Sequence, residues 1–219
     1  MNQNPKNELS AYNFEEHWNK AYQKTPTTSL GWYEENPTPS LELIEACNLP
    51  NDAVIFNAGA GSTSLINRLL EKGYNNIIVN DISETALEIL KNDLTIDKAS
   101  NVQFIIDDLT NSTALLKLKN IDLWHDRAVL HFFTENYQQE AYFKLINKVI
   151  KLNGYIILAQ FNLKGAVKCC GLDIINYNEE MLQKGLGENF KLLKSFDYTY
   201  TQPSENTREY VYTLFKRIH

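Results

Sequence analysis

The spacing of hydrophobic positions changes in a regular way from residue 53 onward. Short apolar runs rich in β-branched residues alternate with longer segments whose apolar residues recur every three or four positions. The short runs are typical of buried parallel strands and cover residues 53–57, 76–80, 102–106, 121–124 and 154–161. The longer segments are typical of amphipathic helices and cover residues 65–73, 83–92, 113–118 and 137–151. This βαβ alternation predicts an α/β fold with a doubly wound, mostly parallel sheet.

Both ends of the chain depart from this alternation. Residues 10–24 carry an apolar stripe at helical spacing, and a second helix is expected from residue 39 to about residue 48. Near the C-terminus, two long strand-like runs at 189–200 and 208–217 are joined without a helix, which predicts an antiparallel hairpin. We therefore expect one domain over residues 1–219, with an N-terminal helical lid over 1–50 and a sheet-based core over 51–219.

Composition narrows the class of protein. A formal net charge of -6 over 219 residues argues for solubility and against a nucleic-acid or anionic-membrane partner. The N-terminus lacks the apolar stretch of a signal peptide, and no apolar run is long enough to span a membrane. Three cysteines are too few for a disulfide framework, and Cys169 and Cys170 lack the spacing of a zinc motif. We expect a cytoplasmic protein without a bound metal.

A glycine turn follows the first predicted strand. Gly59 and Gly61 allow the backbone to turn sharply and to approach a ligand closely, and Ser62 or Thr63 can cap the next helix. Asp81 follows the second strand about 20 residues later, the spacing expected for an acid on ribose hydroxyls. A nicotinamide- or flavin-binding turn would have its third glycine where this chain has Ser64, which disfavours a dinucleotide.

Polar side chains also follow the other predicted strands. Asp107 and Asp108 come after the third strand, and the run from Trp124 to Arg127 comes at the end of the fourth. Ligands of open α/β sheets bind beyond the carboxyl ends of the strands, so these groups should meet at one crevice.

These motifs resemble those of class I S-adenosylmethionine-dependent methyltransferases over nearly the whole chain. The turn from Asn57 to Thr63 is similar to the first motif of that family, although Asn57 stands where the family usually has an acid. The likeness implies a Rossmann-like, seven-stranded sheet closed by the antiparallel hairpin, with S-adenosyl-L-methionine as methyl donor. The donor-binding residues implied by the likeness are Trp18, Trp32, Asn57, Gly59, Gly61, Ser62, Asp81, Ile82, Asp108, Leu109 and His125.

A narrower likeness concerns the segment from Leu123 to Leu130 and the aromatic residues near Trp18 and Trp32. It resembles thiopurine S-methyltransferase-like enzymes and also small lysine methyltransferases that act on translation elongation factor. A thiol or amine acceptor must lose a proton, which makes titratable groups near the fourth strand useful. The residues expected on the acceptor side are His125, Asp126, Arg127 and His131.

Three functions stay open at this stage. The first is methyl transfer to the sulfur, nitrogen or oxygen of a small-molecule acceptor, which the short lid and the lack of a docking domain favour. The second is methylation of a protein lysine. The third, suggested by Asn57, is a catalytically silent nucleoside-binding protein.

Overall fold

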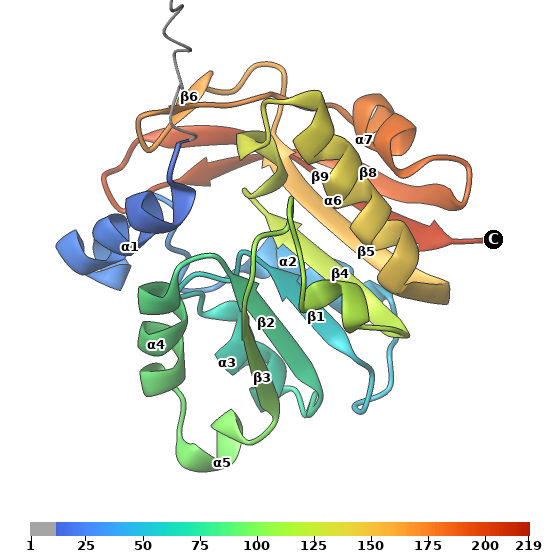
Figure 1. The fold of residues 1–219 in the computed structure, drawn as a ribbon, viewed down its shortest axis with the longest axis horizontal. Helices are drawn as coiled ribbons and strands as arrows, with labels where there is room; N and C mark the ends of the chain where they lie inside the picture. Colours follow the sequence, from blue (N-terminus) through green and yellow to red (C-terminus); the bar gives the residue numbers. More distant parts are fainter. Residues whose placement is uncertain (1–11) are drawn as a thin grey trace, which may run out of the picture.

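A mixed, mostly parallel sheet organises the computed structural model, which describes residues 12–219 (Figure 1). The seven strands lie in the order β3-β2-β1-β4-β5-β9-β8. All pairs from β3 to β5 are parallel, and β9 pairs antiparallel with both β5 and β8. The strands are β1 (Ile55–Ala58), β2 (Ile77–Asp81), β3 (Val102–Ile106), β4 (Ile121–Arg127), β5 (Ile150–Phe161), β8 (Phe190–Thr201) and β9 (Thr207–Arg217). The Rossmann-like fold and the C-terminal antiparallel hairpin predicted from the sequence are therefore confirmed.

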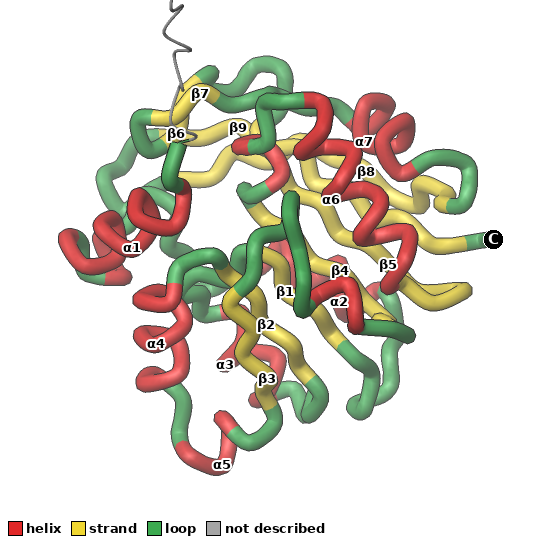
Figure 2. Tube along the Cα trace, in the orientation of Figure 1, coloured by secondary structure: helices red, strands yellow, loops and turns green. Residues whose placement is uncertain are grey.

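Helices cover both faces of this sheet (Figures 1 and 2). The α-helices are α1 (Phe14–Lys24), α2 (Thr38–Ala46), α3 (Leu65–Glu71), α4 (Glu84–Asp93), α5 (Ile96–Ala99), α6 (Asn136–Val149) and α7 (Glu179–Leu186). Short 3₁₀ turns are η1 (Thr27–Ser29), η2 (Leu115–Lys117) and η3 (Leu130–Phe132). None of the helices between residues 12 and 219 is long and apolar enough to cross a membrane.

Alternating side chains of each strand build two apolar layers, because successive strand residues point to opposite faces. On β1, Ile55 packs with α2, α3 and α4 on one face, whereas Phe56 packs with α6 and α7 on the other. The Phe56 ring stacks on Trp124 of β4, with ring centroids 4.3 Å apart. Both layers are closed to solvent, which fits strands that read as continuous apolar runs.

Most predicted strands are found with shifts of one or two residues at their ends, but β5 begins four residues before its predicted start and the fourth strand is also longer than predicted. The predicted fourth strand covers residues 121–124, and polar site residues were expected to follow it. Instead β4 continues to Arg127, because His125, Asp126 and Arg127 pair with β5 and His125 and Asp126 also pair with β1. Partners from distant parts of the chain satisfy these polar side chains, which allows a polar run to form a buried strand.

Several elements were missed. No element was predicted at α5, at α7, or at the small hairpin of β6 (Lys168–Cys169) and β7 (Leu172–Asp173). They are short, so their periodicity is weak. The predicted helix over residues 10–24 corresponds to α1, and residues 1–11 lie outside the described part of the chain.

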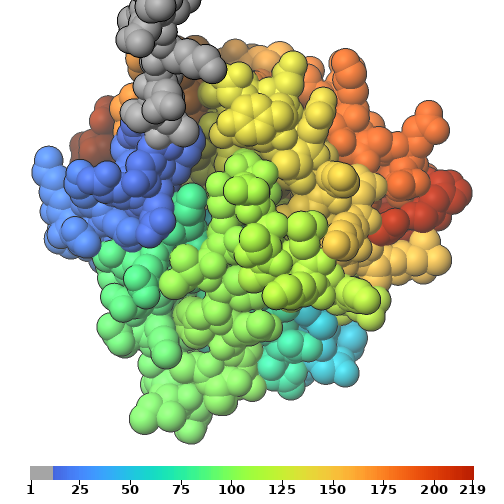
Figure 3. All heavy atoms as spheres, viewed as in Figure 1, coloured from blue at the N-terminus to red at the C-terminus, as the bar shows by residue number. Residues whose placement is uncertain are grey.

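The N-terminal segment, which we call the lid, comprises α1 and residues 25–37. Its α1 lies directly against α4 (Figure 3). Asn19 fixes this contact, because its Oδ1 accepts hydrogen bonds from the Ser83 hydroxyl at 2.7 Å and from the Thr85 amide at 3.2 Å. Ser83 in turn caps α4 through the Ala86 amide. The lid thereby joins the helix that follows β2.

Candidate active site

A cavity of about 880 Å³ lies between the lid and the carboxyl ends of the parallel strands. This is where open α/β sheets bind their ligands. Most of the residues singled out from the sequence lie on its wall: Trp18, Trp32, Asn57, Gly59, Ser62, Asp81, Ile82, Asp108, Leu109, His125 and Arg127. Gly61, Asp126 and His131 lie outside the lining.

The glycine turn is tightly enclosed by side chains from elsewhere. Gly59 has φ +52, and a Cβ added there would lie 2.3 Å from Val129 Cγ2. Gly61 has φ +56, and its added Cβ would lie 2.2 Å from the Tyr22 hydroxyl oxygen. Both the left-handed backbone and the lack of space require glycine at these two positions.

The hydroxyls after this turn do not cap α3 as simply as predicted. The N-cap position is Ser64, whose side chain makes no capping hydrogen bond and instead donates to the Glu34 carbonyl at 2.5 Å. Thr63 Oγ1 accepts from the Leu65 amide at 3.2 Å. Ser62 pairs with Thr27 of the lid at 3.1 Å. Two of these three hydroxyl residues therefore connect the turn to the lid.

Asp81 ends β2 and faces both the cavity and the glycine turn. Its two carboxyl oxygens accept hydrogen bonds from the Gly61 and Ser83 amides, each at 2.8 Å. The side chain is buried, and this desolvation, partly offset by the backbone amides, raises its pKa to about 6. A carboxyl group with this pKa is protonated as the pH falls below about 6, and it then accepts fewer hydrogen bonds.

The two acids after β3 differ in their surroundings. Asp107 Oδ2 accepts from the Ser112 hydroxyl and from the amides of Thr113, Ala114 and Leu115. Burial acts against ionisation, but these donors prevail and lower the pKa of Asp107. Asp108 has one oxygen bonded to Thr110 alone, through both its amide and its hydroxyl. Asp107 thus holds a loop together, whereas Asp108 has more capacity for a ligand.

His125 is buried in the middle of a chain of polar contacts. Its Nδ1 lies 3.2 Å from Asn57 Oδ1 on β1, and its Nε2 lies 2.9 Å from the Ser40 hydroxyl on α2. Because an amide oxygen can only accept, Nδ1 donates and Nε2 accepts. Burial, with a smaller contribution from the charge of Arg127, lowers the pKa of His125 to about 3. The imidazole is therefore neutral at physiological pH and both of its nitrogens are occupied.

Asp126 is fully buried behind the cavity wall. Its oxygens accept from the Val129 amide, the Leu130 amide, the Tyr142 hydroxyl and the Gln160 amide group, at 2.5–3.1 Å. Burial raises the pKa of Asp126, and these donors act in the opposite direction. The carboxylate fixes the turn that carries the chain from β4 into η3.

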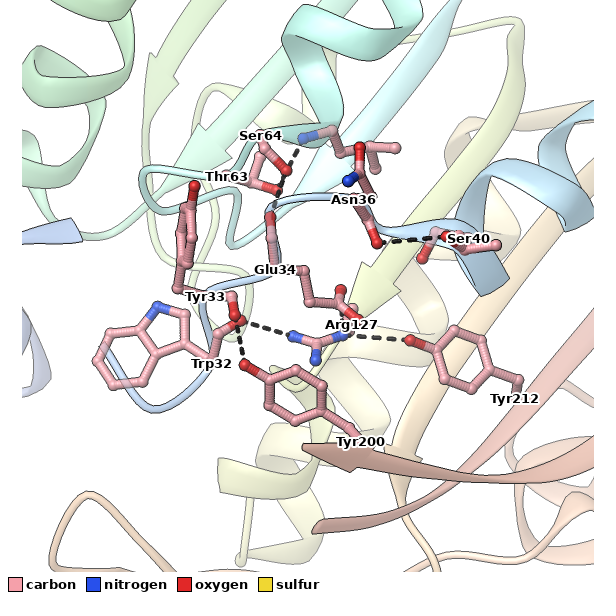
Figure 4. A network of polar contacts seen from close by, with 12 residues as sticks. Trp32, Tyr33, Glu34, Asn36, Ser40, Thr63, Ser64, Arg127, Tyr200 and Tyr212 are labelled. Atoms are coloured by element: carbon pink, nitrogen blue, oxygen red, sulfur yellow. Dashed lines mark hydrogen bonds and ion pairs between the residues drawn. The ribbon is translucent and has the colours of Figure 1, made fainter. Parts of the chain in front are cut away.

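Arg127 connects the sheet to the lid (Figure 4). Its Nη1 donates to the Trp32 carbonyl at 3.0 Å, and its Nε lies 2.9 Å from Glu34 Oε2 and 3.2 Å from the Tyr212 hydroxyl. The guanidinium also lies 4.8 Å from the ring centroid of Tyr200 and 4.9 Å from that of Tyr210. The buried Nη2 has no hydrogen-bond partner among residues 12–219.

Aromatic side chains of the lid meet the turn after β4. Trp18 packs edge-to-face on Trp32, with centroids 5.7 Å apart, and on Phe132, with centroids 5.0 Å apart. His131 is fully buried, with its ring 4.4 Å from that of Phe132 and 4.8 Å from that of Phe161. Neither ring nitrogen of His131 has a hydrogen-bond partner within the described chain.

Sequence reasoning missed several residues that shape this site. Glu34 and Ser40 lie in or next to the lid, and Asn80 lies on β2. Asn80 donates to the carbonyls of Ile105 and Asp107, and its buried Oδ1 is without a partner within residues 12–219. No local pattern marks these residues, because their roles depend on contacts that are distant in sequence.

The site fits S-adenosylmethionine. Asp81 and Asp108 supply carboxylates for hydroxyl and amino groups, and Asn80 Oδ1 is an unused acceptor beside them. The aromatic faces of Trp18 and Trp32 suit a sulfonium, which is attracted by π-electron density. A cluster of three or more residues able to hold a metal ion is not found in residues 12–219.

Comparisons with known proteins agree with this fit. The family described as "Methyltransferase domain" matches residues 50–216. The chain is 26% identical over 160 residues to EEF1A lysine methyltransferase 2 of Danio rerio. This alignment covers 67% of this chain and 68% of that protein.

Solved structures share the fold. A SAM-dependent methyltransferase from Anabaena variabilis superposes with TM-score 0.73 at 14% identity, covering 93% of each chain. The 1,6-didemethyltoxoflavin-N1-methyltransferase of Burkholderia thailandensis, solved with 1,6-didemethyltoxoflavin and S-adenosylhomocysteine bound, superposes with TM-score 0.65 at 16% identity, covering 84% of this chain and 78% of that one. With the family match spanning most of the chain, this protein belongs to the methyltransferase domain family and is a class I S-adenosylmethionine-dependent methyltransferase.

Proposed function

We propose that this enzyme methylates a small-molecule acceptor enclosed between the lid and the sheet. One observation carries the proposal: the donor-side wall and an aromatic wall built by Phe132, Phe161 and Tyr210 belong to one continuous cavity under the lid. Pockets for single small molecules measure about 300–1,000 Å³. A volume of about 880 Å³ therefore supports space for the donor and a compact acceptor together.

We infer that the donor lies with its adenosine along the glycine turn. Asp81 would accept hydrogen bonds from the ribose hydroxyls, and Asp108 with Leu109 and Ile82 would border the adenine. Trp18 and Trp32 would cover the sulfonium. When bound, S-adenosylmethionine supplies the methyl group on a positively charged sulfur, and the protein contributes alignment and exclusion of water.

The polar residues of β4 support alignment in this proposal. His125 is neutral and bonded at both nitrogens, so we assign it the positioning of Asn57 against α2. Asp126 positions the turn bearing Val129 and Leu130. Arg127 holds the lid through the Trp32 carbonyl, and its unpartnered Nη2 is a donor for an anionic group of donor or acceptor.

His131 lies behind the cavity wall and does not line it, and it is our candidate for the group that takes the proton of the acceptor through one intervening water. Its unbonded ring nitrogens distinguish it from His125, and it packs against two cavity-lining aromatic rings. Buried imidazole without a hydrogen-bond partner is rare enough to suggest a function. A His131→Asn variant should lose turnover with little change in donor binding; unchanged turnover at every pH would contradict this assignment.

A protein lysine is the second candidate acceptor. The similarity to EEF1A lysine methyltransferase 2 favours it, as do two exposed aromatic residues on the cavity wall, Tyr12 at 54% exposure and Tyr137 at 66%. Exposed aromatic groups around a cavity are common at protein interfaces.

Tritium-labelled donor separates the two acceptors. The enzyme is incubated with it in a cell extract that is then divided into small-molecule and protein fractions. We expect label in the small-molecule fraction, and an Asp81→Ala variant serves as the control for enzyme-dependent transfer. Label confined to protein would establish the second candidate instead.

A further inference from the structure

A pair of adjacent cysteines lies at the wall of the cavity, in a hairpin to which the proposed reaction assigns no role. Cys169 ends β6, and Cys170 with Gly171 forms the two-residue connection to β7. Cys170 has φ +52 and Gly171 has φ +81, the backbone signs of a type I′ turn. A left-handed conformation is uncommon for cysteine. Both side chains line the cavity, and their sulfur atoms are 3.7 Å apart.

The surroundings of this pair favour a thiolate on Cys169. The Cys170 sulfur lies 3.7 Å away and can share its proton with Cys169, and the positive charge of Arg208 acts in the same direction, so that the pKa of Cys169 is lowered despite partial burial. Cys47 provides a contrast within the chain. It is the C-cap residue of α2 and packs in an apolar cluster, where burial raises its pKa to about 12.

We propose that Cys169 and Cys170 form a peroxide-sensitive dithiol that closes to a disulfide at the edge of the acceptor cavity. The Cys169 thiolate attacks the terminal oxygen of a hydroperoxide, the O–O bond breaks, and the departing hydroxide or alkoxide is protonated to water or an alcohol, respectively. The resulting sulfenic acid on Cys169 is attacked by the Cys170 sulfur, which loses its proton. A sulfur–sulfur bond forms and a water molecule leaves, so two thiols are oxidised while one peroxide is reduced.

The geometry makes this disulfide easy to reverse. Disulfide-linked residues usually have Cα atoms about 4.4–6.8 Å apart, whereas adjacent residues in a trans peptide are only about 3.8 Å apart. The ring that links neighbours is strained, and strained disulfides are the readily reduced, regulatory ones. Drawing the sulfurs together from 3.7 Å requires the connection between β6 and β7 to change shape.

The consequence for activity rests on the function proposed above. Cys169 and Cys170 lie on the cavity wall together with Phe161 and Tyr210, whereas the glycine turn and Asp81 are on other elements. Closing the disulfide should therefore impair acceptor turnover and leave donor-side binding in place.

The first test counts thiols in the intact, full-length protein. The reduced protein, without donor, is treated with one equivalent of hydrogen peroxide, unfolded, and titrated for thiols. We expect three thiols before treatment and one after it, with the monomer lighter by two hydrogen atoms and the loss reversed by dithiothreitol. Retention of all three thiols, a disulfide-linked dimer or oxygen added without loss of Cys170 would overturn the proposal.

Matched variants then assign the effect. Cys47→Ala should also lose two thiols, from two to none, and Cys170→Ser should stop at a sulfenic acid that dimedone traps on Cys169. In the wild type, oxidation should lower methyl transfer about tenfold or more, since small displacements of aligned reactants are costly. Binding of S-adenosylhomocysteine should change less than about twofold. If peroxide inactivated a Cys169→Ser/Cys170→Ser double variant as strongly as the wild type, the link between the disulfide and turnover would be refuted. If the wild type lost two thiols as expected but its reduced form transferred no methyl group to small molecules, the proposed function would be rejected instead.

Discussion

Gly61 is one of the points at which the glycine turn touches the lid, and its replacement by alanine tests that contact. The added Cβ would lie 2.2 Å from the Tyr22 hydroxyl oxygen, in a backbone with φ +56. A left-handed conformation costs an L-residue about 1–2 kcal/mol. Tyr22 must also move, which breaks its hydrogen bond from Trp32 Nε1 at 3.2 Å and costs about 1 kcal/mol more. We expect Gly61→Ala to lower the free energy of unfolding by about 2–3 kcal/mol.

Tyr22→Phe separates the two contributions. It removes the oxygen at 2.2 Å and leaves a ring carbon at 3.2 Å from the added Cβ. Urea unfolding of the wild type, both single variants and the double variant gives the coupling energy. The double variant should be about 1 kcal/mol more stable than the sum of the single effects, because the hydrogen bond is lost only once.

Gly171→Ala is the matched control for backbone strain, since Gly171 has φ +81 and no atom lies within 4 Å of its added Cβ. Calorimetry with S-adenosylhomocysteine shows whether the lid contact also affects the donor. Binding should weaken in Gly61→Ala and partly recover when Tyr22→Phe is added. Additive stabilities, within about 0.3 kcal/mol, would refute the contact between the turn and the lid.

Three further predictions concern ionisable groups of the site. Asp81→Ala should weaken binding of S-adenosylhomocysteine more than Asp107→Ala, which should mainly lower stability, and equal effects of the two variants on binding would contradict the ribose placement. Below pH about 6 the affinity of the wild type should drop by up to about tenfold per pH unit, and Asp81→Asn should remove this pH dependence. Because the pKa of His125 is lowered, this residue takes up a proton below pH about 6.5 in the unfolded chain but only near pH 3 in the folded chain. The free energy of unfolding should therefore fall on acidification between these pH values, by at most about 1.4 kcal/mol per pH unit. Urea unfolding of His125→Gln at several pH values should show a smaller change of this free energy with pH. Arg127→Met leaves Glu34 buried without its partner, so it should lower the free energy of unfolding by about 3–5 kcal/mol and raise the KM of the acceptor. The double variant Arg127→Met/Glu34→Gln should recover part of this stability. No recovery in thermal unfolding would exclude the ion pair as the cause.

The sequence predicted the sheet well because each buried strand has a local signature. The third strand was predicted with the bounds that β3 has, since its apolar run is short and sharply ended. The polar end of β4 carried no such signature. His125 is satisfied by Asn57 and Ser40, which lie 68 and 85 residues away along the chain, so nothing near it indicates a buried strand. Which site residues touch a ligand stays a prediction.

The Asn57–His125–Ser40 chain also bears on the unusual amide of the first motif. At this position an acid would place a buried negative charge where Asn57 Oδ1 now lies, 3.2 Å from Nδ1 of an imidazole that is neutral in this chain. Either the charge would be unpaired or the imidazole would have to be protonated, and both states are costly without solvent. With Asn57 every contact is between neutral groups, so α2 and β1 are joined without a buried charge in these contacts. The amide therefore fits its surroundings as a compatible alternative to the acid, which weakens the inference that Asn57 marks a silent enzyme.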